Sequence, residues 1–270
     1  MNLFTRILQV SLAVIIFSAS SFANEVNLYS GRHYDSDEKL YAKFTAKTGI
    51  KVNVISGKGK ALMQQIITEG NSSPADLFVT VDAGNLWKAQ KEGLFQKITS
   101  SIVDSVVPKN LRGPNNEWVA LAKRARIMYY NPRTVTAAEL DGLTYEDLAK
   151  PEWNGRVVIR KSSNMYNQSL VASLVANHGV DATEAWANGL VANMARKPEG
   201  NDRAQIMAVA NGEADIAVAN SYYIALMLSG KKGTEQQAAA NKVVPFFPSQ
   251  NGRGTHINVS GIGLLKGPNT

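Results

Sequence analysis

The sequence predicts an α/β fold of two lobes with a ligand cleft between them. Three observations support this prediction. Apolar runs typical of strands alternate with amphipathic helical segments over residues 26–93. Residues 117–131 are extended in character, with no Gly or Pro inside them, as expected of a strand that passes from one lobe to the other. A second alternation begins at Gly155, and such alternation favours right-handed βαβ units and a mostly parallel sheet.

The first lobe is predicted from three strands, each followed by a helix. The strands are residues 26–30, 51–56 and 77–81. The first helix begins at Asp35 and Ser36, which are start signals, and Gly49 ends it. The second helix ends at Gly70, and the third covers residues 86–93.

The second lobe is predicted from two strands and the helices around them. The strands are residues 156–160 and 214–219, and the helices are 168–178, 181–196 and 201–212, followed by a turn and helix at the pair Tyr222-Tyr223. The predicted domain limits are a signal peptide at 1–23, a first lobe at 24–120 to which 243–270 return, and a second lobe at 121–242.

The first 23 residues have the pattern of a secretory signal peptide. Arg6 precedes an apolar run at residues 7–17, and Ser21-Phe22-Ala23 provides a small-residue cleavage site. The run is too short to span a bilayer as a helix. We therefore expect the mature protein to be soluble outside the cytoplasm.

The composition excludes several classes of function. The chain has no cysteine, which excludes a disulfide scaffold, a thiolate metal site and a lipid anchor on an N-terminal Cys. Its net charge of +7 is spread along the chain, so nucleic acid is not an expected partner. A basic surface suits an anionic ligand, or is simply solvated. No nucleophile elbow, zinc-protease motif or phosphate-binding glycine loop is present, so we do not expect an enzyme.

Tyrosines follow the carboxyl ends of three predicted strands. Tyr34 follows residues 26–30, Tyr166 follows 156–160, and the pair Tyr222-Tyr223 follows 214–219. In open α/β sheets this edge is where ligands bind. Four phenol oxygens gathered from two lobes would make a hard pocket suited to Fe(III). Because phenols titrate near pH ~10, only a strongly Lewis-acidic trivalent ion readily displaces their protons.

Each candidate residue has an alternative interpretation. His33 either adds a nitrogen ligand or is an exposed turn residue. Arg124 and Arg126 share one strand face; they either line the cleft, where they would compensate phenolate charge, or lie on the surface. The alternative for the tyrosines is core packing, which is how we interpret the pair Tyr129-Tyr130.

Eight segments resemble the bacterial periplasmic ferric-iron-binding proteins, whose metal chemistry is transferrin-like, and in particular their cyanobacterial and marine branch. The segments are 28–34, 73–76, 123–126, 153–160, 163–169, 212–215, 220–223 and 252–256. The His-Tyr turn, the lone tyrosine of an Asn-rich loop and the Tyr-Tyr pair occur in the family's order. The resemblance covers nearly the whole chain after residue 23 and implies the two-lobe periplasmic-binding-protein fold.

The resemblance also implies a ligand set and a function. The residues that match the family's iron ligands are His33, Tyr34, Tyr166, Tyr222 and Tyr223, and those that match its positive charge near the metal are Arg124 and Arg126. The implied function is to bind Fe(III) in the periplasm as a monomer and to deliver it to the permease of an inner-membrane ABC transporter. The alternative in the same fold is a receptor for a small anion or other polar solute.

Two departures from the family pattern stand out. Some relatives have an arginine one turn after the tyrosine pair, where this chain has Leu226, so one route of charge compensation is absent here. The chain also ends at Thr270, after a strand, whereas family members continue with further helices. This sequence is therefore consistent with a fragment that lacks the C-terminal part of the fold.

Overall fold

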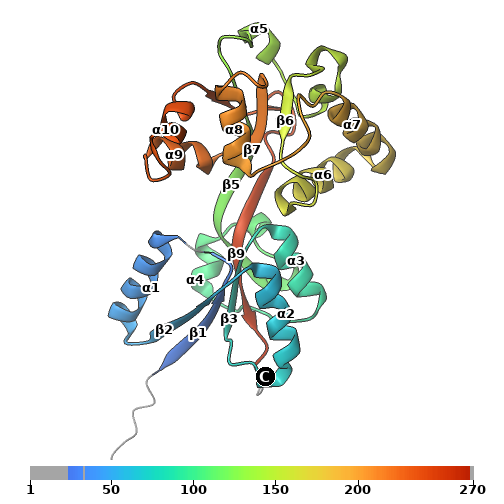
Figure 1. Ribbon diagram of the computed structural model, residues 1–270. Helices are drawn as coiled ribbons and strands as arrows, with labels where there is room; N and C mark the ends of the chain where they lie inside the picture. Colours follow the sequence, from blue (N-terminus) through green and yellow to red (C-terminus); the bar gives the residue numbers. More distant parts are fainter. Residues whose placement is uncertain (1–23, 33, 268–270) are drawn as a thin grey trace, which may run out of the picture.

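The computed structural model describes residues 24–32 and 34–267, and these form two lobes connected by two long strands (Figure 1). Helices α1 to α4 belong to the first lobe and helices α5 to α10 to the second. The predicted signal peptide at residues 1–23 and the candidate ligand His33 lie outside the described residues. Among the described residues, no helix is both long enough and apolar enough to cross a membrane.

The first lobe is built on a sheet that combines parallel and antiparallel pairs. Its strands are β1 (Glu25–Ser30), β2 (Lys51–Ser56), β3 (Leu77–Val81), β4 (Phe95–Gln96) and β9 (Ile257–Leu265). Strand β1 pairs in parallel with β2 and β3, whereas β9 is antiparallel to β3 and β4. The helices are α1 (Asp35–Thr48), α2 (Gly59–Glu69), α3 (Ala83–Lys91) and α4 (Ser101–Val106). Tyr29, Phe78 and Leu86 are buried in the core of this lobe.

Strand β5 (Trp118–Tyr130) runs from the first lobe into the second. Its pairing with β9 extends from Trp118 to Ala125, and its pairing with β7 (Ile216–Asn220) begins at Arg126. The strand predicted at residues 117–131 is thereby confirmed. The short strand β8 (Val244–Phe246) pairs with the second-lobe half of β5. The domain limits 24–120, 121–242 and 243–270 stay a prediction.

The second lobe surrounds β7 and the parallel strand β6 (Val157–Ile159). Its helices are α5 (Ala137–Leu140), α6 (Met165–His178), α7 (Val180–Ala192), α8 (Asp202–Ala210), α9 (Tyr222–Leu228) and α10 (Thr234–Ala240). Side chains of a strand alternate between its two faces. Met128 accordingly packs in one core cluster with Tyr145 and Trp186, while Tyr129 packs in another with Ile206. Both faces of the sheet are therefore covered.

Short 3-10 helices occupy several of the connections. They are η1 (Gly70–Ser72), η2 (Lys109–Leu111), η3 (Pro114–Asn116), η4 (Glu146–Ala149) and η5 (Pro151–Trp153). The sequence patterns did not predict them, because a single tight turn leaves no hydrophobic periodicity.

The parallel sheet that the sequence predicts is only partly correct. The pairs β1–β2, β1–β3 and β6–β7 are parallel, but every pair made by β5 or β9 is antiparallel. The mostly parallel sheet was wrong because the two connecting strands run in opposite directions between the lobes. They join the parallel units into one strand order, β2-β1-β3-β9-β5-β7-β6.

Helix ends follow local chemistry. Helix α1 ends where Gly49 adopts the left-handed conformation, with φ at 74°, and has three acidic residues in its first turn. Helix α6 begins three residues earlier than predicted, because the Asn164 side chain accepts a hydrogen bond from the Tyr166 amide at 3.0 Å and caps the helix. Tyr166 consequently lies in the first turn of α6.

Candidate functional site

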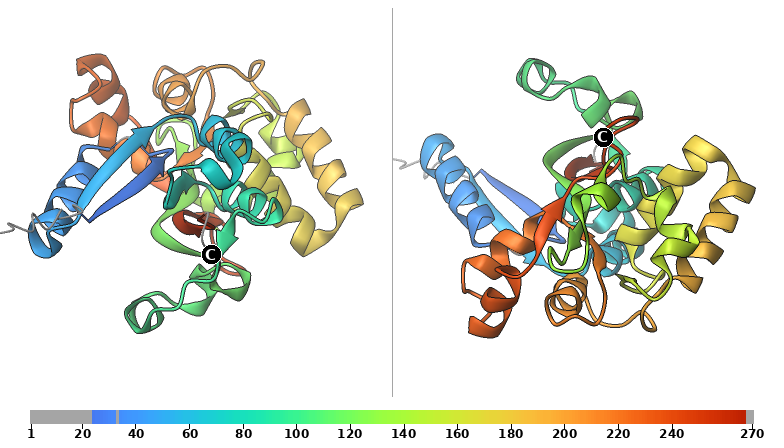
Figure 2. Two further views of the ribbon diagram at one scale, coloured as in Figure 1. Left: turned by 90° about the horizontal axis from the view of Figure 1, so that it is seen from below. Right: turned by 90° about the horizontal axis from the view of Figure 1, so that it is seen from above.

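The four predicted site tyrosines lie together where the two lobes meet. Tyr34 precedes α1 in the first lobe, Tyr166 is in the first turn of α6, and the pair Tyr222-Tyr223 begins α9. All four line one cavity of about 450 Å³. Figure 2 shows α1 and the α9–α10 helices on one side of the connecting strands and α3 with α6 and α7 on the other.

The hydroxyl groups of these tyrosines are close to one another. Tyr222 Oη donates to Tyr166 Oη at 3.4 Å, and the rings of Tyr222 and Tyr223 have centroids 4.3 Å apart. Tyr34, Tyr166 and Tyr222 also line a smaller cavity of about 200 Å³ against the connecting strands. Convergence from three separate segments of the chain, expected from the strand-end rule, is therefore observed.

Burial makes three of these phenols harder to deprotonate than an exposed tyrosine. It raises the pKa of Tyr34 and of Tyr222, and the neighbouring phenol of Tyr166 raises both further. Burial also raises the pKa of Tyr223 to about 12. Only a strong electrophile at their oxygens would remove these protons at neutral pH.

Three arginines stack on the rings of the cluster. The Arg32 guanidinium carbon lies 5.0 Å from the ring centroid of Tyr34, and Arg32 is held by two hydrogen bonds of 2.8 Å to Asp37. Arg124 and Arg160 lie 5.2 Å and 5.5 Å from the ring centroid of Tyr166. Positive charge therefore surrounds the phenols from both lobes.

Arg124 and Arg126 are both buried, so their alternative placement on the surface was wrong. Arg124 lines the smaller cavity and pairs with Asp82 at 3.2 Å. Arg126 does not line that cavity but pairs with Asp202 at 2.7 Å.

Arg126 connects two of the segments that hold tyrosines. It donates to Asn167 Oδ1 at 2.7 Å and to Asn220 Oδ1 at 3.2 Å. Asn167 follows Tyr166 directly, and Asn220 lies two residues before Tyr222. The guanidinium of Arg126 thus fixes the spacing between the two segments.

Several residues around the cluster were missed from the sequence. Arg160 was seen only as the last residue of a strand, and Arg32 only as part of a turn. Arg203, Lys231 and Lys232 line the 450 Å³ cavity beside the tyrosines. No signal in the sequence marks these residues, because they share no motif and come from separate segments that only the tertiary structure brings together.

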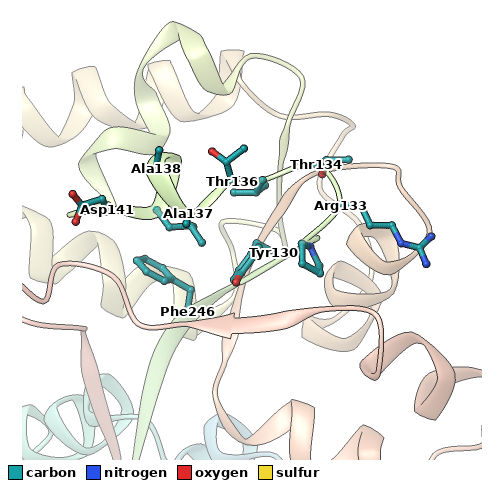
Figure 3. A pocket seen from close by; sticks show the side chains of 11 residues that line it. Tyr130, Arg133, Thr134, Thr136, Ala137, Ala138, Asp141 and Phe246 are labelled. Atoms are coloured by element: carbon teal, nitrogen blue, oxygen red, sulfur yellow. The ribbon is translucent and has the colours of Figure 1, made fainter.

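A further cavity, of about 860 Å³, lies at the opposite end of the second lobe beside α5. Figure 3 shows the Phe246 and Tyr130 rings facing Ala137 of α5, with Arg133 turned away from them. None of the candidate site residues that the structure describes lines it. We therefore take the tyrosine cluster as the candidate site.

A two-lobe α/β fold with a cavity between its lobes is typical of solute-binding proteins. This chain belongs to the family described as bacterial extracellular solute-binding proteins, whose sequence profile matches residues 72–251. The resemblance inferred from the sequence motifs is thereby confirmed.

Two similar proteins come from Synechocystis sp. Iron uptake protein A1 is 54% identical over 242 residues, which are 90% of this chain and 66% of that protein. Iron uptake protein A2 is 46% identical over 250 residues, or 92% of this chain and 70% of that protein. The chain spans about two thirds of the length of these curated relatives.

Solved structures of similar proteins confirm the two-lobe fold. The Trichodesmium protein IdiA or FutA, in complex with iron and citrate ligands, superimposes with a TM-score of 0.86 at 56% identity. The match covers 91% of this chain and 77% of that one. A ferric binding protein from Campylobacter jejuni matches with a TM-score of 0.82 at 42% identity, over 89% of this chain and 75% of that one.

Proposed function

We propose that this chain binds Fe(III) between its lobes through the phenolate oxygens of its clustered tyrosines, Tyr34, Tyr166, Tyr222 and Tyr223. One observation carries the proposal: phenols from both lobes line a single cavity. We propose His33, which precedes Tyr34 in the sequence, as a further ligand. The names of the relatives, which are iron uptake and ferric binding proteins, support this choice of solute.

The raised pKa values favour Fe(III) over softer or less acidic ions. Burial raises the pKa of Tyr34, Tyr222 and Tyr223, so a bound cation must displace protons that are held more firmly than those of free tyrosine. Tyrosinate is a known iron ligand in haem proteins, and hard oxygen donors prefer hard trivalent ions. Reduction to Fe(II) would therefore weaken binding.

The neighbouring arginines would balance the charge of the loaded site. Four phenolates around one Fe(III) leave a net charge of minus four plus three, or minus one. Arg124, which is 8% exposed and stacks on Tyr166, is the cation best placed to offset it, joined by Arg32 and Arg160. The guanidinium of Arg126 bonds Asn167 and Asn220, which lie close to Tyr166 and Tyr222 in the sequence, so its proposed role is to set the spacing of these two tyrosines.

We propose that the protein works in the periplasm as a monomeric receptor and is not an enzyme. The signal-peptide pattern of residues 1–23 and the relatives named as periplasmic proteins support that location. Rotation of the lobes about β5 and β9 would enclose the ion. The closed form would then dock on the permease of an inner-membrane ABC transporter and release iron there.

Absorbance spectroscopy tests the proposal directly. Purified protein loaded with ferric citrate should show a visible charge-transfer band from tyrosinate to iron. The double substitution Tyr222→Phe/Tyr223→Phe should abolish the band, because it removes two donors and keeps the rings. Tyr130→Phe is the matched control, since Tyr130 lines the separate cavity beside α5 and should leave the band unchanged.

A colourless protein that still retains stoichiometric iron would overturn the ligand assignment. A protein that takes up no iron at all would overturn the proposed function.

A receptor for a small anion is the second candidate. The observation that favours it is the row of cations, Arg203, Lys231 and Lys232, along the tyrosine-lined cavity. Calorimetry with phosphate and sulfate, with polyamines as a cationic solute and ferric citrate alongside, separates the candidates. Heat from phosphate or sulfate alone, with none from iron, would favour the anion receptor.

A further inference from the structure

The carboxylate of Asp82 receives hydrogen bonds from four different elements of the fold. Its Oδ1 accepts from the Gly84 amide of α3 at 2.9 Å and from Ser169 Oγ of α6 at 2.6 Å. Its Oδ2 accepts from Arg124 of β5 at 3.2 Å and from Asn258 of β9 at 2.9 Å. Asp82 is 0% exposed, so this set of donors replaces its hydration completely.

Asp82 is fixed to the first lobe and to the connecting strands. It follows β3 directly and caps α3, and its amide donates to Val259 O at 2.9 Å. Its backbone has φ at 82°, a region that non-glycine residues rarely adopt. A conformation of this kind persists only where the surrounding contacts hold it, and the four donors to its carboxylate supply that hold.

Ser169 lies in the second lobe, on the same helix as Tyr166 and three residues after it. The bond from Ser169 to Asp82 therefore joins one lobe to the other. Arg124, on the other oxygen of the same carboxylate, stacks on the ring of Tyr166. Asp82 thus contacts the helix that presents Tyr166 and also the arginine that packs on it.

The start of α3 packs directly against α6 beside this bond. A Cβ atom added to Gly84 would lie 3.0 Å from Met165 Sδ and 3.8 Å from Ser169 Oγ. The two helices lie on the same side of the connecting strands (Figure 1). Separation of α3 from α6 would therefore have to break the bond between Ser169 and Asp82.

We propose that Ser169 and Asp82 form a latch that stabilises the arrangement in which the two lobes are closed on each other. A rotation about β5 and β9 that moves α6 away from α3 removes one donor from a buried carboxylate and exposes it to water. The latch also holds the N-terminal part of α6, and so the position of Tyr166. Its effect on lobe position is independent of iron, whereas its effect on iron release rests on the proposed function.

Distance measurements on iron-free protein test the latch. The chain contains no cysteine, so Lys88→Cys on α3 and Ala176→Cys on α6, both exposed, accept spin labels without other substitutions. Pulsed electron paramagnetic resonance then reports the separation of the two helices. Ser169→Ala should shift the distribution of distances between the two labels toward longer values than in the labelled protein that retains Ser169.

Ser173→Ala is the matched control, one turn further along α6 and without contact to Asp82. It removes the same hydroxyl from the same helix and should leave the distance distribution unchanged. The melting temperatures of both variants should stay within a few degrees of the parent, because each loses a single side-chain oxygen. Equal distance distributions for Ser169→Ala and the parent would overturn the latch.

Iron release supplies the second readout. Release from loaded Ser169→Ala to an excess of chelator should be about tenfold faster than from the parent or from Ser173→Ala, as expected for one hydrogen bond to a charged group. A protein that never takes up iron contradicts the proposed function, while the distances in iron-free protein still decide the latch. If Ser169→Ala shifts the label distances but releases iron at the rate of the parent, the latch stands and only its effect on iron release is overturned.

Discussion

The tyrosines of the candidate site and those of the second-lobe core differ in what their hydroxyl groups contact. Tyr129 Oη donates to the main-chain oxygens of Asn220 and Ser221 at 3.0 Å and 3.2 Å, and Tyr145 Oη donates to the main-chain oxygen of Arg126. In the site, by contrast, Tyr222 donates to another phenol, Tyr166. A phenol bonded to the main chain stabilises the fold, whereas phenols that face each other can accept a common cation.

The candidate-site tyrosines and the core tyrosines also differ in the charges around their rings. Burial raises the pKa of Tyr129 and Tyr145, as it does for Tyr34, Tyr222 and Tyr223. Stacked arginines, however, lie on Tyr34 and Tyr166. Burial alone therefore does not identify a metal ligand; the partners of the oxygen and the cations around the ring do.

The largest expected effect comes from removing one site phenol. Tyr166→Phe should lower the affinity for Fe(III) by at least about a hundredfold, the upper end of what loss of an outer-sphere partner costs a metal site. The free energy of unfolding of iron-free protein should change by less than about 0.5 kcal/mol, because the lost hydrogen bond is long, at 3.4 Å. Competition with a chelator and thermal denaturation measure the two quantities.

If Tyr166→Phe binds iron normally, the phenol is not a ligand and the contrast between the two sets of tyrosines fails. Tyr130→Phe again serves as the control, with no expected change in either quantity.

Removing a core phenol should have the opposite profile. Tyr145→Phe deprives the Arg126 carbonyl and the His256 amide of a hydrogen-bond partner. With Tyr145 at 0% exposure, we expect a loss of about 1–3 kcal/mol in the free energy of unfolding. Iron affinity, measured by chelator competition, should stay within a few-fold of the parent. Unchanged stability would show that these bonds contribute little to the fold.

Local signals in the sequence predicted much of the fold. Strands β2 and β3 have the predicted bounds, and α1 ends at Gly49 as predicted. The bounds of β9 were not predicted, because Gly261 and Gly263 weaken its strand pattern. The structure explains both glycines: a Cβ at Gly261 would lie 2.7 Å from Val119 O, and one at Gly263 would overlap the Phe95 ring.

The site was predicted in part, for a comparable reason. The rule that ligands bind at the carboxyl ends of strands brought Tyr34, Tyr166 and the pair Tyr222-Tyr223 together. The rule says nothing of which charges surround them. Arg160 and Asp82 could not be predicted, since their ion pairs join segments far apart in the sequence.

Titration of the tyrosines with alkali should distinguish those of the candidate site from those of the core only in the presence of iron. Unfolded tyrosines ionise near pH ~10, while Tyr223 in the fold has its pKa raised to about 12 by burial. The stabilising effect of this shift is therefore complete below pH ~10 and is lost as pH rises toward about 12. Unfolding curves across this window should show stability falling in iron-free protein, and less so in Tyr223→Phe.

Iron should shift ionisation of the site phenols to neutral pH and leave Tyr129 and Tyr145 unaffected. The ultraviolet absorbance of phenolate, recorded with and without iron, measures this, and proton release on iron addition should accompany it. Acid should conversely release iron, because protons compete for the phenolates. An ultraviolet titration that is identical with and without iron would contradict phenolate binding.

The smallest expected effect comes from a stacked cation. Arg160→Gln should lower iron affinity about three- to tenfold, the effect of losing one nearby charge at a partly buried ring. Arg160→Lys should restore most of that loss if charge matters, and none of it if the planar guanidinium is required. The fold should tolerate both changes. Arg160 pairs with Asp202 at 3.4 Å, and when this pair is lost Asp202 keeps its shorter pair with Arg126, at 2.7 Å. Arg133→Gln, beside the separate cavity, should change nothing, so an equal loss there would indicate a general effect of net charge rather than an arginine placed over a phenolate.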